Sequence, residues 1–530
     1  MTTYPMFNIN FSGKWRHCGC AYARGFAFFD GGELLNSCRL AEFFAECHDE
    51  HAFAAALEKC NGMFSVVVCN PDFRAAAIDG TRLYPVFFKV QAQTVSLADD
   101  PYCLLDSDSA LDADSKAIYD ASAAALSGTT LVGNVRQLPA FCYAVFSNGG
   151  EVVLKSYYDY LTQKTDEVER SCEEMMKALD NAFGRLKQYV GNRQVVVPLS
   201  GGYDSRTIVC MLKKHGFSDV LCYTVSRDGT KELDDARRVA ERLGVRFLQI
   251  NNKDVSASFL SDPQFDRYVR HLGCLTNFVW LFEYFAIIKM RSLGVLRSDA
   301  VFMPGHSGDF LGGSLLTKMN VGENCSDEAI ARNLLLNHFE YNFGQKAQQI
   351  VTCRISAMRG ATSYSKAQQF IFENKLPMQI NNSARVYDFF GYEAVLPFWD
   401  MELLDFFKTA SREQLYQKRL YNETLNSMLF AQFGVEMADT DFVPDEVLSW
   451  QRLKNRLKHY IPRLVLSANA KFDDVVGEAE LAAMMLAQLT QDKNPLSAFV
   501  CRHSYTSSNE IIKDWYLMKV SQALAQAKKK

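Results

Sequence analysis

The sequence predicts an α/β protein: an N-terminal α+β sandwich over residues 1–160, then a parallel-sheet α/β domain over residues 161–530 with a helical C-terminal part. Three observations support this prediction. Short apolar runs separated by turn residues fill the first 160 positions. After residue 194, strand-like runs alternate with helical patterns, as in βαβ units. From about Gln264 onward, helical spacing dominates.

Antiparallel strands are expected in the first part, because its apolar runs are bounded by Gly, Pro, Asn and Asp. The segment Arg39–Lys59 has helical spacing. Polar residues replace both patterns between Tyr157 and Arg170, so we place the domain boundary near Tyr160. The expected strands are Phe64–Val68, Ala75–Ile78, Val86–Val90, Thr94–Leu97 and Cys142–Phe146.

The second part begins with the apolar strand Val195–Leu199. Helices are expected at Thr207–His215 and Glu232–Leu243, between successive strands. Because such crossovers are right-handed, the strands should form one parallel sheet. The further expected strands are Val220–Val225, Phe247–Ile250 and Ala300–Met303.

Composition narrows the class of protein. The chain has 530 residues, of which 48% are hydrophobic, and this excludes a disordered or fibrous protein. Lys plus Arg is 57 and Asp plus Glu is 61, so no basic excess supports nucleic-acid binding. The fifteen cysteines are mostly scattered, which is typical of reduced thiols in a cytoplasmic protein. We expect neither a signal peptide nor a membrane helix, and hence no membrane partner.

One loop carries chemistry. Ser200-Gly201-Gly202-Tyr203-Asp204-Ser205 follows a buried strand and precedes a helix. The glycines allow a tight turn, the hydroxyls can donate to phosphate, and the helix N-terminus favours anions. Asp204 would repel phosphate unless a divalent cation lay between them, so the loop predicts an ATP and Mg²⁺ site. The alternative is an ordinary glycine-rich turn in which Ser205 caps the helix.

This loop resembles the SGGxDS pyrophosphate loop of the N-type ATP pyrophosphatases. Tyr223–Ser226, Glu232–Gly244 and Pro304–Gly313 extend the resemblance to the asparagine synthetase family, whose GEGADELFGG loop the last segment resembles. The resemblance implies catalytic roles for Asp204 and Asp309, which would also hold Mg²⁺, and His306 in the second loop is a further candidate catalytic residue. The resemblance also implies that ATP contacts Leu199, Ser200, Gly201, Gly202, Asp204, Ser205, Val225 and Gly305, the backbone at Val225 holding the adenine.

The first part resembles the glutaminase domain of the same family, an N-terminal nucleophile (Ntn) sandwich. Asn61–Phe64 resembles its NGxFAF signature, and Asp79–Phe88 resembles its RDRxGxxPLYY hairpin. Such glutaminases use an N-terminal cysteine activated by its own amine, whereas position 2 here is Thr2. Neither Cys18 nor Cys20 can supply a terminal amine. We therefore expect a degenerate domain that hydrolyses no glutamine.

Two further positions depart from the family pattern. His306 replaces a glutamate and could either hydrogen-bond the loop or act as a base for the incoming amine. Family members carry a lysine where this chain reads Met437–Asp441. Four residues could take the place of this lysine, and the sequence gives no basis for choosing among them: Lys454, Lys458, Lys471 and Arg385.

The segment Gly391–Asp400 resembles the family's GxExRxPFLD segment, which closes the synthetase site. Its apolar side chains Leu396, Phe398 and Trp399 are expected mainly to pack in the core.

The expected function is therefore an AMP-forming and pyrophosphate-forming amide ligase. Its substrates would be a small-molecule or peptide carboxylate and ammonia or an amine. The loops at Ser200–Arg206 and Gly305–Gly313 resemble those of relatives in surface-polysaccharide clusters, which suggests a uronic acid. A β-lactam-synthetase-like or lasso-peptide-cyclase-like ligase and a nucleotide-binding pseudoenzyme are the alternatives, and a homodimer is left open.

Overall fold

The structure is a computed structural model. The ranges that it describes are 6–91, 94–147, 150–162, 166–252, 255, 257–314, 325–338, 341, 343–358, 362–436, 476, 478–491 and 508–529.

Two β-sheets form the first part of the chain. The larger sheet has the order β11-β10-β6-β5-β3-β2, with β4 paired to β3, and the smaller has the order β1-β8-β7-β9. All five strands expected in this part are present. The strands are β1 Met6–Asn10, β2 Arg16–Cys18, β3 Ala21–Phe29, β4 Glu33–Asn36, β5 Cys60–Cys69, β6 Arg74–Ile78, β7 Phe87–Gln91, β8 Thr94–Ala98, β9 Arg136–Gln137, β10 Cys142–Phe146 and β11 Val152–Ser156.

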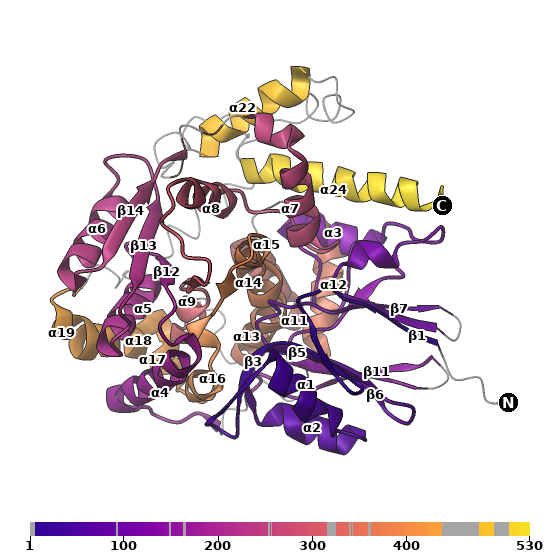
Figure 1. The fold of residues 1–530 in the computed structure, drawn as a ribbon, viewed down its shortest axis with the longest axis horizontal. Coiled ribbons are helices and arrows are strands. Elements are labelled where there is room, and N and C mark those ends of the chain that lie inside the picture. Colours follow the sequence, from indigo (N-terminus) through magenta and orange to yellow (C-terminus); the bar gives the residue numbers. More distant parts are fainter. Residues whose placement is uncertain are drawn as a thin grey trace.

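The two sheets are stacked. Val67 of the larger sheet and Phe88 of the smaller belong to one buried apolar cluster between them. Helices α1 (Ser37–Ala45) and α2 (Glu50–Glu58) pack on the other face of the larger sheet (Figure 1). The helical spacing of residues 39–59 thus belongs to two helices, because the Asp49 side chain accepts a hydrogen bond from the backbone of Ala52 and starts a new helix.

A five-stranded parallel sheet forms the centre of the second part, with the order β14-β13-β12-β15-β16. The first four strands are the expected ones, whereas β16 lies in a segment where only packing or site closure was expected. The strands are β12 Val195–Pro198, β13 Val220–Val225, β14 Arg246–Ile250, β15 Val301–Phe302 and β16 Glu393–Ala394.

Helices flank this sheet and form the C-terminal part (Figure 1). The helices that matter for the site are α4 Cys172–Val190, α5 Tyr203–Lys214, α6 Lys231–Leu243, α8 Phe282–Ser292, α9 Gly308–Gly312, α15 Arg385–Phe389 and α18 Arg419–Thr424.

The remaining helical segments are α3 Ala113–Ser122, α7 Pro263–Gly273, α11 Asp327–His338, α12 Gln345–Ser356, α13 Ser363–Phe370, η5 Ile371–Ile380, α14 Asn381–Ser383, α16 Met401–Lys408, α17 Arg412–Leu415, η8 Leu425–Phe430, α19 Ala431–Phe433, α22 Glu478–Gln491 and α24 Ser508–Ala527, with short turns of helix η1 Pro101–Leu104, η4 Ala257–Ser261, η6 Pro397–Trp399 and η7 Tyr416–Lys418.

The first and second parts of the chain share an extensive buried contact. Asn61 of β5 donates to Asp400, with 3.0 Å between the side-chain nitrogen and oxygen. Helix α24 lies against both parts, because its Tyr516 contacts the Tyr102 hydroxyl at 3.1 Å and accepts a hydrogen bond from the backbone of Leu275 (Figure 1). The predicted boundary near Tyr160 stays a prediction. Within the described ranges, none of the helices has the length and apolarity needed to cross a bilayer.

Candidate functional site

The SGGYDS loop connects β12 to α5 and closes on itself. The Ser205 hydroxyl accepts a hydrogen bond from the backbone of Ser200 at 3.0 Å, and the two serine hydroxyls lie 2.9 Å apart. Gly202 is the N-cap of α5, and no side chain caps this helix. The alternative in which Ser205 caps the helix is therefore wrong. No side chain therefore competes with an anion for the first backbone N–H groups of α5.

A second loop, which follows β15, packs tightly against the first. A Cβ atom added to Gly308 would lie 2.6 Å from the Asp204 carboxyl carbon, and one added to Gly305 would lie 3.0 Å from the backbone nitrogen of Ser205. Between them, Ser307 has a φ of +75° and its hydroxyl accepts a hydrogen bond from the Trp399 indole at 3.0 Å. Only glycine allows the two loops to approach this closely.

The two aspartates expected to bind metal lie together. The backbone N–H of Asp309 donates to Asp204 Oδ2 at 2.7 Å, and the Tyr421 hydroxyl donates to Asp204 Oδ1 at 2.9 Å. Burial and the neighbouring Asp309 raise the pKa of Asp204 to about 7, although Tyr421 and Lys418 oppose the shift. Two adjacent carboxylates with so little compensating charge form an environment that favours a cation.

Lys418 brings a positive charge to this pair. Its ammonium lies 3.0 Å from Asp309 Oδ1. Gln417 and Lys418 both have positive φ values, 57° and 58°, just before α18 begins. No local sequence signal identifies Lys418 as a site residue, because neither Gln nor Lys favours this backbone region. Among the described residues that line the cavity below, Lys418 is the only lysine or arginine.

These loops line a cavity of about 390 Å³, which is within the usual range for small-molecule sites. Its lining combines both loops with side chains that the sequence did not connect to them, including Glu283 from the first turn of α8. The lining residues are Pro198, Ser200, Gly202, Tyr203, Asp204, Ser205, Glu283, Pro304, Gly305, His306, Asp309, Tyr387 and Lys418.

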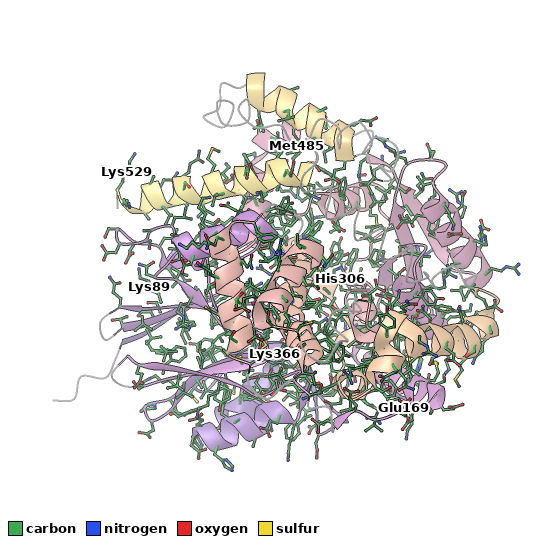
Figure 2. The ribbon with its side chains drawn as sticks, turned by 180° about the vertical axis from the view of Figure 1, so that it is seen from behind. Lys89, Glu169, His306, Lys366, Met485 and Lys529 are labelled. Atoms are coloured by element: carbon green, nitrogen blue, oxygen red, sulfur yellow. The ribbon has the colours of Figure 1, made fainter. Side chains whose placement is uncertain are left out.

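Two lining residues carry buried polar atoms without a hydrogen-bond partner in the described structure: His306 Nδ1 and Glu283 Oε2. His306, which is labelled in Figure 2, is partly buried. Burial lowers the pKa of His306 to about 4, so its imidazole is neutral near pH 7. Burial raises the pKa of Glu283. Both atoms could therefore meet a polar group of a ligand.

Three residues expected to contact ATP do not line this cavity. The backbone N–H of Leu199 donates to Tyr223 at 2.8 Å, and the Gly201 carbonyl accepts from Arg206 at 3.1 Å. Val225 ends β13 beside Ile250. Their expected contacts with ATP stay predictions.

Of the four stand-ins for the family's lysine, only Arg385 lies in the described ranges, and it does not line this cavity. Arg385 is buried elsewhere, where its guanidinium lies 3.0 Å from Cys274 Sγ. The other three residues lie outside the described ranges, as do Thr2 and the segment 437–441. These positions are Lys454, Lys458 and Lys471.

The segment that resembles GxExRxPFLD is mainly core, as expected. Leu396, Phe398 and Trp399 are almost completely buried. Trp399 also holds the second loop through Ser307, so its packing helps to position the site.

A central parallel strand leading through SGGYDS into a helix, with a second aspartate brought alongside, defines an α/β protein of the ATP pyrophosphatase class. Comparison with known families identifies the domain more closely: residues 176–420 match the family model for asparagine synthase. The match assigns residues 176–420, a little under half of the chain, to this family model.

Individual relatives match shorter segments. An NH₃-dependent NAD⁺ synthetase from Pyrococcus horikoshii is 30% identical over 159 residues, which are 29% of this chain and 58% of that protein. A 7-cyano-7-deazaguanine synthase from Pseudomonas putida is 41% identical over 81 residues, 14% of this chain and 35% of that protein. A glutamine-hydrolysing GMP synthase from Aliivibrio fischeri is 33% identical over 98 residues, which are 17% of this chain and 19% of that protein. The chain thus spans less than two thirds of the length of each relative.

Solved structures overlap the chain only loosely. The allosteric regulatory enzyme of purine biosynthesis covers 54% of the chain and of its own length, with 11% identity and a TM-score of 0.18. Glutamine phosphoribosylpyrophosphate amidotransferase from B. subtilis covers 56% of this chain and 64% of its own, with 10% identity and a TM-score of 0.18.

Proposed function

We propose that this protein is an ATP-dependent carbon–nitrogen ligase that activates a carboxylate as its adenylate, releases pyrophosphate, and joins the acyl group to ammonia or an amine with release of AMP. One observation carries the proposal: the SGGYDS loop, Asp204 and Asp309 line one cavity inside an asparagine synthase domain. The name of the P. horikoshii relative specifies ammonia, which supports ammonia as one nitrogen donor.

The residues present fit Mg²⁺. This ion usually takes one or two protein carboxylates and completes its shell with phosphate oxygens and water. Asp204 and Asp309 supply two carboxylates, and the raised pKa of Asp204 reflects their mutual repulsion and burial. When bound, the ion would supply neutralising charge to the phosphates.

The chain's own groups orient ATP and hold its charge. The backbone N–H groups at the start of α5, which no side chain caps, and the Lys418 ammonium attract phosphate. The Ser200 and Ser205 hydroxyls, which here contact each other, are placed to turn toward phosphate oxygens. Tyr421 fixes the orientation of the Asp204 carboxylate. Because these groups are already in place, little reorganisation is needed as charge develops on the leaving pyrophosphate.

A base is needed to remove a proton from the incoming amine, and two groups in the cavity are candidates. Glu283 and His306 both line the cavity, and each has a buried polar atom without a hydrogen-bond partner in the described structure. We therefore propose that one of these two groups accepts the proton and that the other hydrogen-bonds the substrate.

The first part of the chain is proposed to be a glutaminase-like Ntn domain that has lost its chemistry. Two stacked sheets with helices on the larger sheet support the likeness to such a domain. Thr2 in place of the nucleophilic cysteine supports the loss of glutaminase activity. Cytoplasmic location, a homodimer and a uronic acid as the acceptor remain predictions.

The test of ATP binding is calorimetry on the wild-type protein and on Asp204→Ala. We expect binding that requires Mg²⁺ and weakens at least tenfold in the variant, about 1.4 kcal/mol. The matched control is Asp234→Ala, a partly exposed acidic residue on α6 whose loss should leave binding unchanged. Binding that survives Asp204→Ala unchanged would place the nucleotide elsewhere.

The test of the reaction is ATP–pyrophosphate exchange. An active ligase exchanges label only when its carboxylate substrate is added, so a panel of uronic acids, amino acids and peptides is screened at fixed Mg²⁺ and ATP. Exchange with one class of carboxylate identifies the substrate class. ATP binding without pyrophosphate exchange for any carboxylate of the panel would instead support the alternative of a nucleotide-binding pseudoenzyme.

A further inference from the structure

A second cavity lies where the two parts of the chain meet. Its volume is about 310 Å³, and it is separate from the cavity of the aspartate pair. The strands and loops of the first part form one wall, and α15 with the segment leading to β16 forms the other. The residues of the first wall include Lys14, Arg16, Arg24 and Tyr84, and those of the second include Arg385, Asp388 and Glu393.

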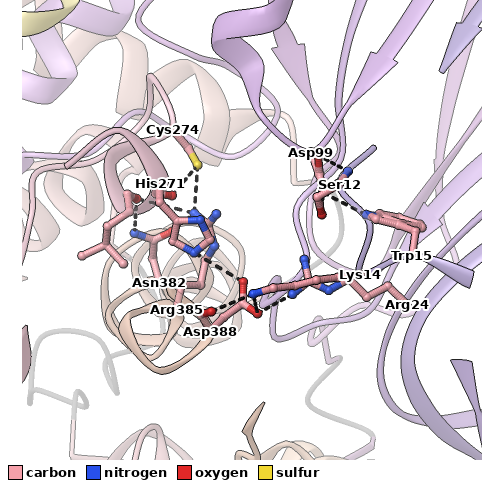
Figure 3. A network of polar contacts seen from close by, with 11 residues as sticks. Ser12, Lys14, Trp15, Arg24, Asp99, His271, Cys274, Asn382, Arg385 and Asp388 are labelled. Atoms are coloured by element: carbon pink, nitrogen blue, oxygen red, sulfur yellow. Dashed lines mark hydrogen bonds and ion pairs between the residues drawn. The ribbon is translucent and has the colours of Figure 1, made fainter. Parts of the chain in front are cut away.

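Positive charge exceeds negative charge in this lining. Four lining residues are cationic, Lys14, Arg16, Arg24 and Arg385, and the two acidic ones are Asp388 and Glu393. Each carboxylate is already engaged. Asp388 pairs with Lys14 at 2.6 Å and with Arg24, as Figure 3 shows. Glu393 pairs with Arg193, at 2.6 Å.

Two cations of the cavity, Arg16 and Arg385, take part in no ion pair within the described part of the chain. Arg385 is 4% exposed, and its contacts are neutral or weakly polar: the Cys274 sulfur at 3.0 Å, the Asn382 carbonyl at 3.3 Å and the backbone of Leu272. Figure 3 shows this group beside the Asp388 cluster.

A second buried guanidinium adds to the imbalance. Arg82 is 1% exposed and donates to the same Asn382 oxygen as Arg385, at 3.0 Å. Its Nη2 atom has no hydrogen-bond partner in the described structure. A buried charge without a counter-ion is costly, and two such charges sharing one amide oxygen are more so. An anion in the adjacent cavity would remove this cost.

We propose that this cavity binds a small molecule bearing a carboxylate or a phosphate group. Arg385 holds the oxyanion from the wall of α15, and Arg16 holds it from β2. The volume suits a ligand of metabolite size rather than a polymer. The Tyr84 ring stacks beneath the Arg24 guanidinium at 4.5 Å and keeps that side chain in the wall.

The site is placed to influence the ligase. Helix α15 carries Arg385 and Asp388 toward the second cavity, and Tyr387 between them lines the cavity of the aspartate pair. Tyr387 in turn lies 3.2 Å from the Tyr223 hydroxyl at the end of β13. A ligand bound to Arg385 therefore contacts α15, the helix whose Tyr387 lines the proposed ATP site.

The test is calorimetric titration of the full-length protein with inorganic phosphate and, separately, with succinate, at constant ionic strength and without ATP. We expect saturable one-site binding of at least one anion. The one that binds more tightly identifies the ligand as a phosphate or a carboxylate. Arg16→Gln, a change on the exposed rim, and Arg385→Gln should each weaken binding at least tenfold. Absence of saturable binding by both anions would overturn the proposal.

Two further variants separate this site from others. Arg39→Gln removes a surface arginine outside the cavity that is paired with Glu33, and should leave anion binding unchanged. Ser205→Ala alters the SGGYDS loop. If anion binding is lost in Ser205→Ala but kept in Arg16→Gln, the anion occupies the phosphate loop and the proposal fails. Because the readout requires no turnover, this result is independent of the proposed ligase activity.

Discussion

At the scale of single residues, the Asp204 carboxylate is held by groups from three elements. It accepts hydrogen bonds from the Asp309 backbone and the Tyr421 hydroxyl, while Lys418 faces Asp309. The carboxyl group of Asp309 is mostly exposed, 61% by area, whereas that of Asp204 lies at the base of the cavity. The two aspartates should therefore act at different stages of the reaction.

We expect Asp309→Asn to leave ATP affinity within a few-fold but to slow the reaction. Charge builds on pyrophosphate only as it leaves, so an outer carboxylate contributes mainly to the transition state. The loss should be roughly 3 kcal/mol, or more than a hundredfold in rate, as for other lost electrostatic groups. Calorimetry and ATP–pyrophosphate exchange measure the two effects. Asp299→Asn, which changes a surface residue, is the control. Equal losses in ATP affinity and in reaction rate would contradict the assignment of Asp309 to the transition state.

At the scale of elements, the site depends on two loops that interlock through glycine. The sequence predicted the first loop well, because a buried β-strand, two glycines and a helix are all local signals. The second loop was recognised by its resemblance to the family's GEGADELFGG loop, but the sequence does not show its contact with Asp204. That contact requires the backbone of Gly308 to touch a carboxylate more than a hundred positions earlier.

Gly308→Ala tests this contact. The new methyl group would lie 2.6 Å from the Asp204 carboxyl carbon, so Asp204 must move. We expect Mg²⁺-dependent ATP binding to weaken at least tenfold, with a fall in melting temperature of only a few degrees. The matched control is Gly344→Ala, where the added Cβ meets no atom within 4 Å. Normal ATP binding by Gly308→Ala would show that the loops are looser than described.

At the scale of the whole molecule, Asp388 links the two parts of the chain. It pairs with Lys14 and Arg24 of the first part and lies 3.4 Å from His271 Nε2 of the second. Burial lowers the pKa of His271 to about 3, so this imidazole is neutral near pH 7. Burial alone would raise the pKa of Asp388, but Arg24, His271 and Lys14 together lower it to about 2. A lowered pKa means that the ionised form stabilises the folded state.

We expect Asp388→Asn to lower the free energy of unfolding by about 2 kcal/mol at pH 7, because lowering the pKa of this carboxyl group from its usual value to about 2 corresponds to roughly that amount. This stabilisation is fully present above about pH 4 and is lost as pH falls toward 2, so the difference from wild type should shrink in acid. Thermal unfolding followed by calorimetry between pH 7 and pH 3 measures it. An exposed pair, Arg297 and Asp299, provides the control Asp299→Asn. A difference that grows in acid would refute the assignment.

The first part of the chain is expected to act as a scaffold. Thr2 has no thiol, and no internal cysteine has a free α-amine beside it. The purified protein should therefore release no glutamate from glutamine above a heat-killed control, with or without ATP. Thr2→Ala should leave AMP formation intact. Glutamate release that disappears in Thr2→Ala would restore a self-sufficient amidotransferase.

The sequence alone determined the local features of this protein: the apolar strands, the helices between them, and the turn Ser200–Asp204 that follows a buried strand. These depend on neighbouring residues, whose periodicity and turn preferences can be read directly. Its family resemblance placed Asp309 beside Asp204, and the structure brings the two together.

Only the tertiary structure decided which distant side chains join them. Lys418, Tyr421 and Glu283 enter the site from separate helical segments. Arg385, which the sequence left as a stand-in for a catalytic lysine, was instead buried beside Arg82. The physical reason is that burial and charge pairing depend on contacts between residues far apart in the chain. No local pattern of residue types specifies those contacts.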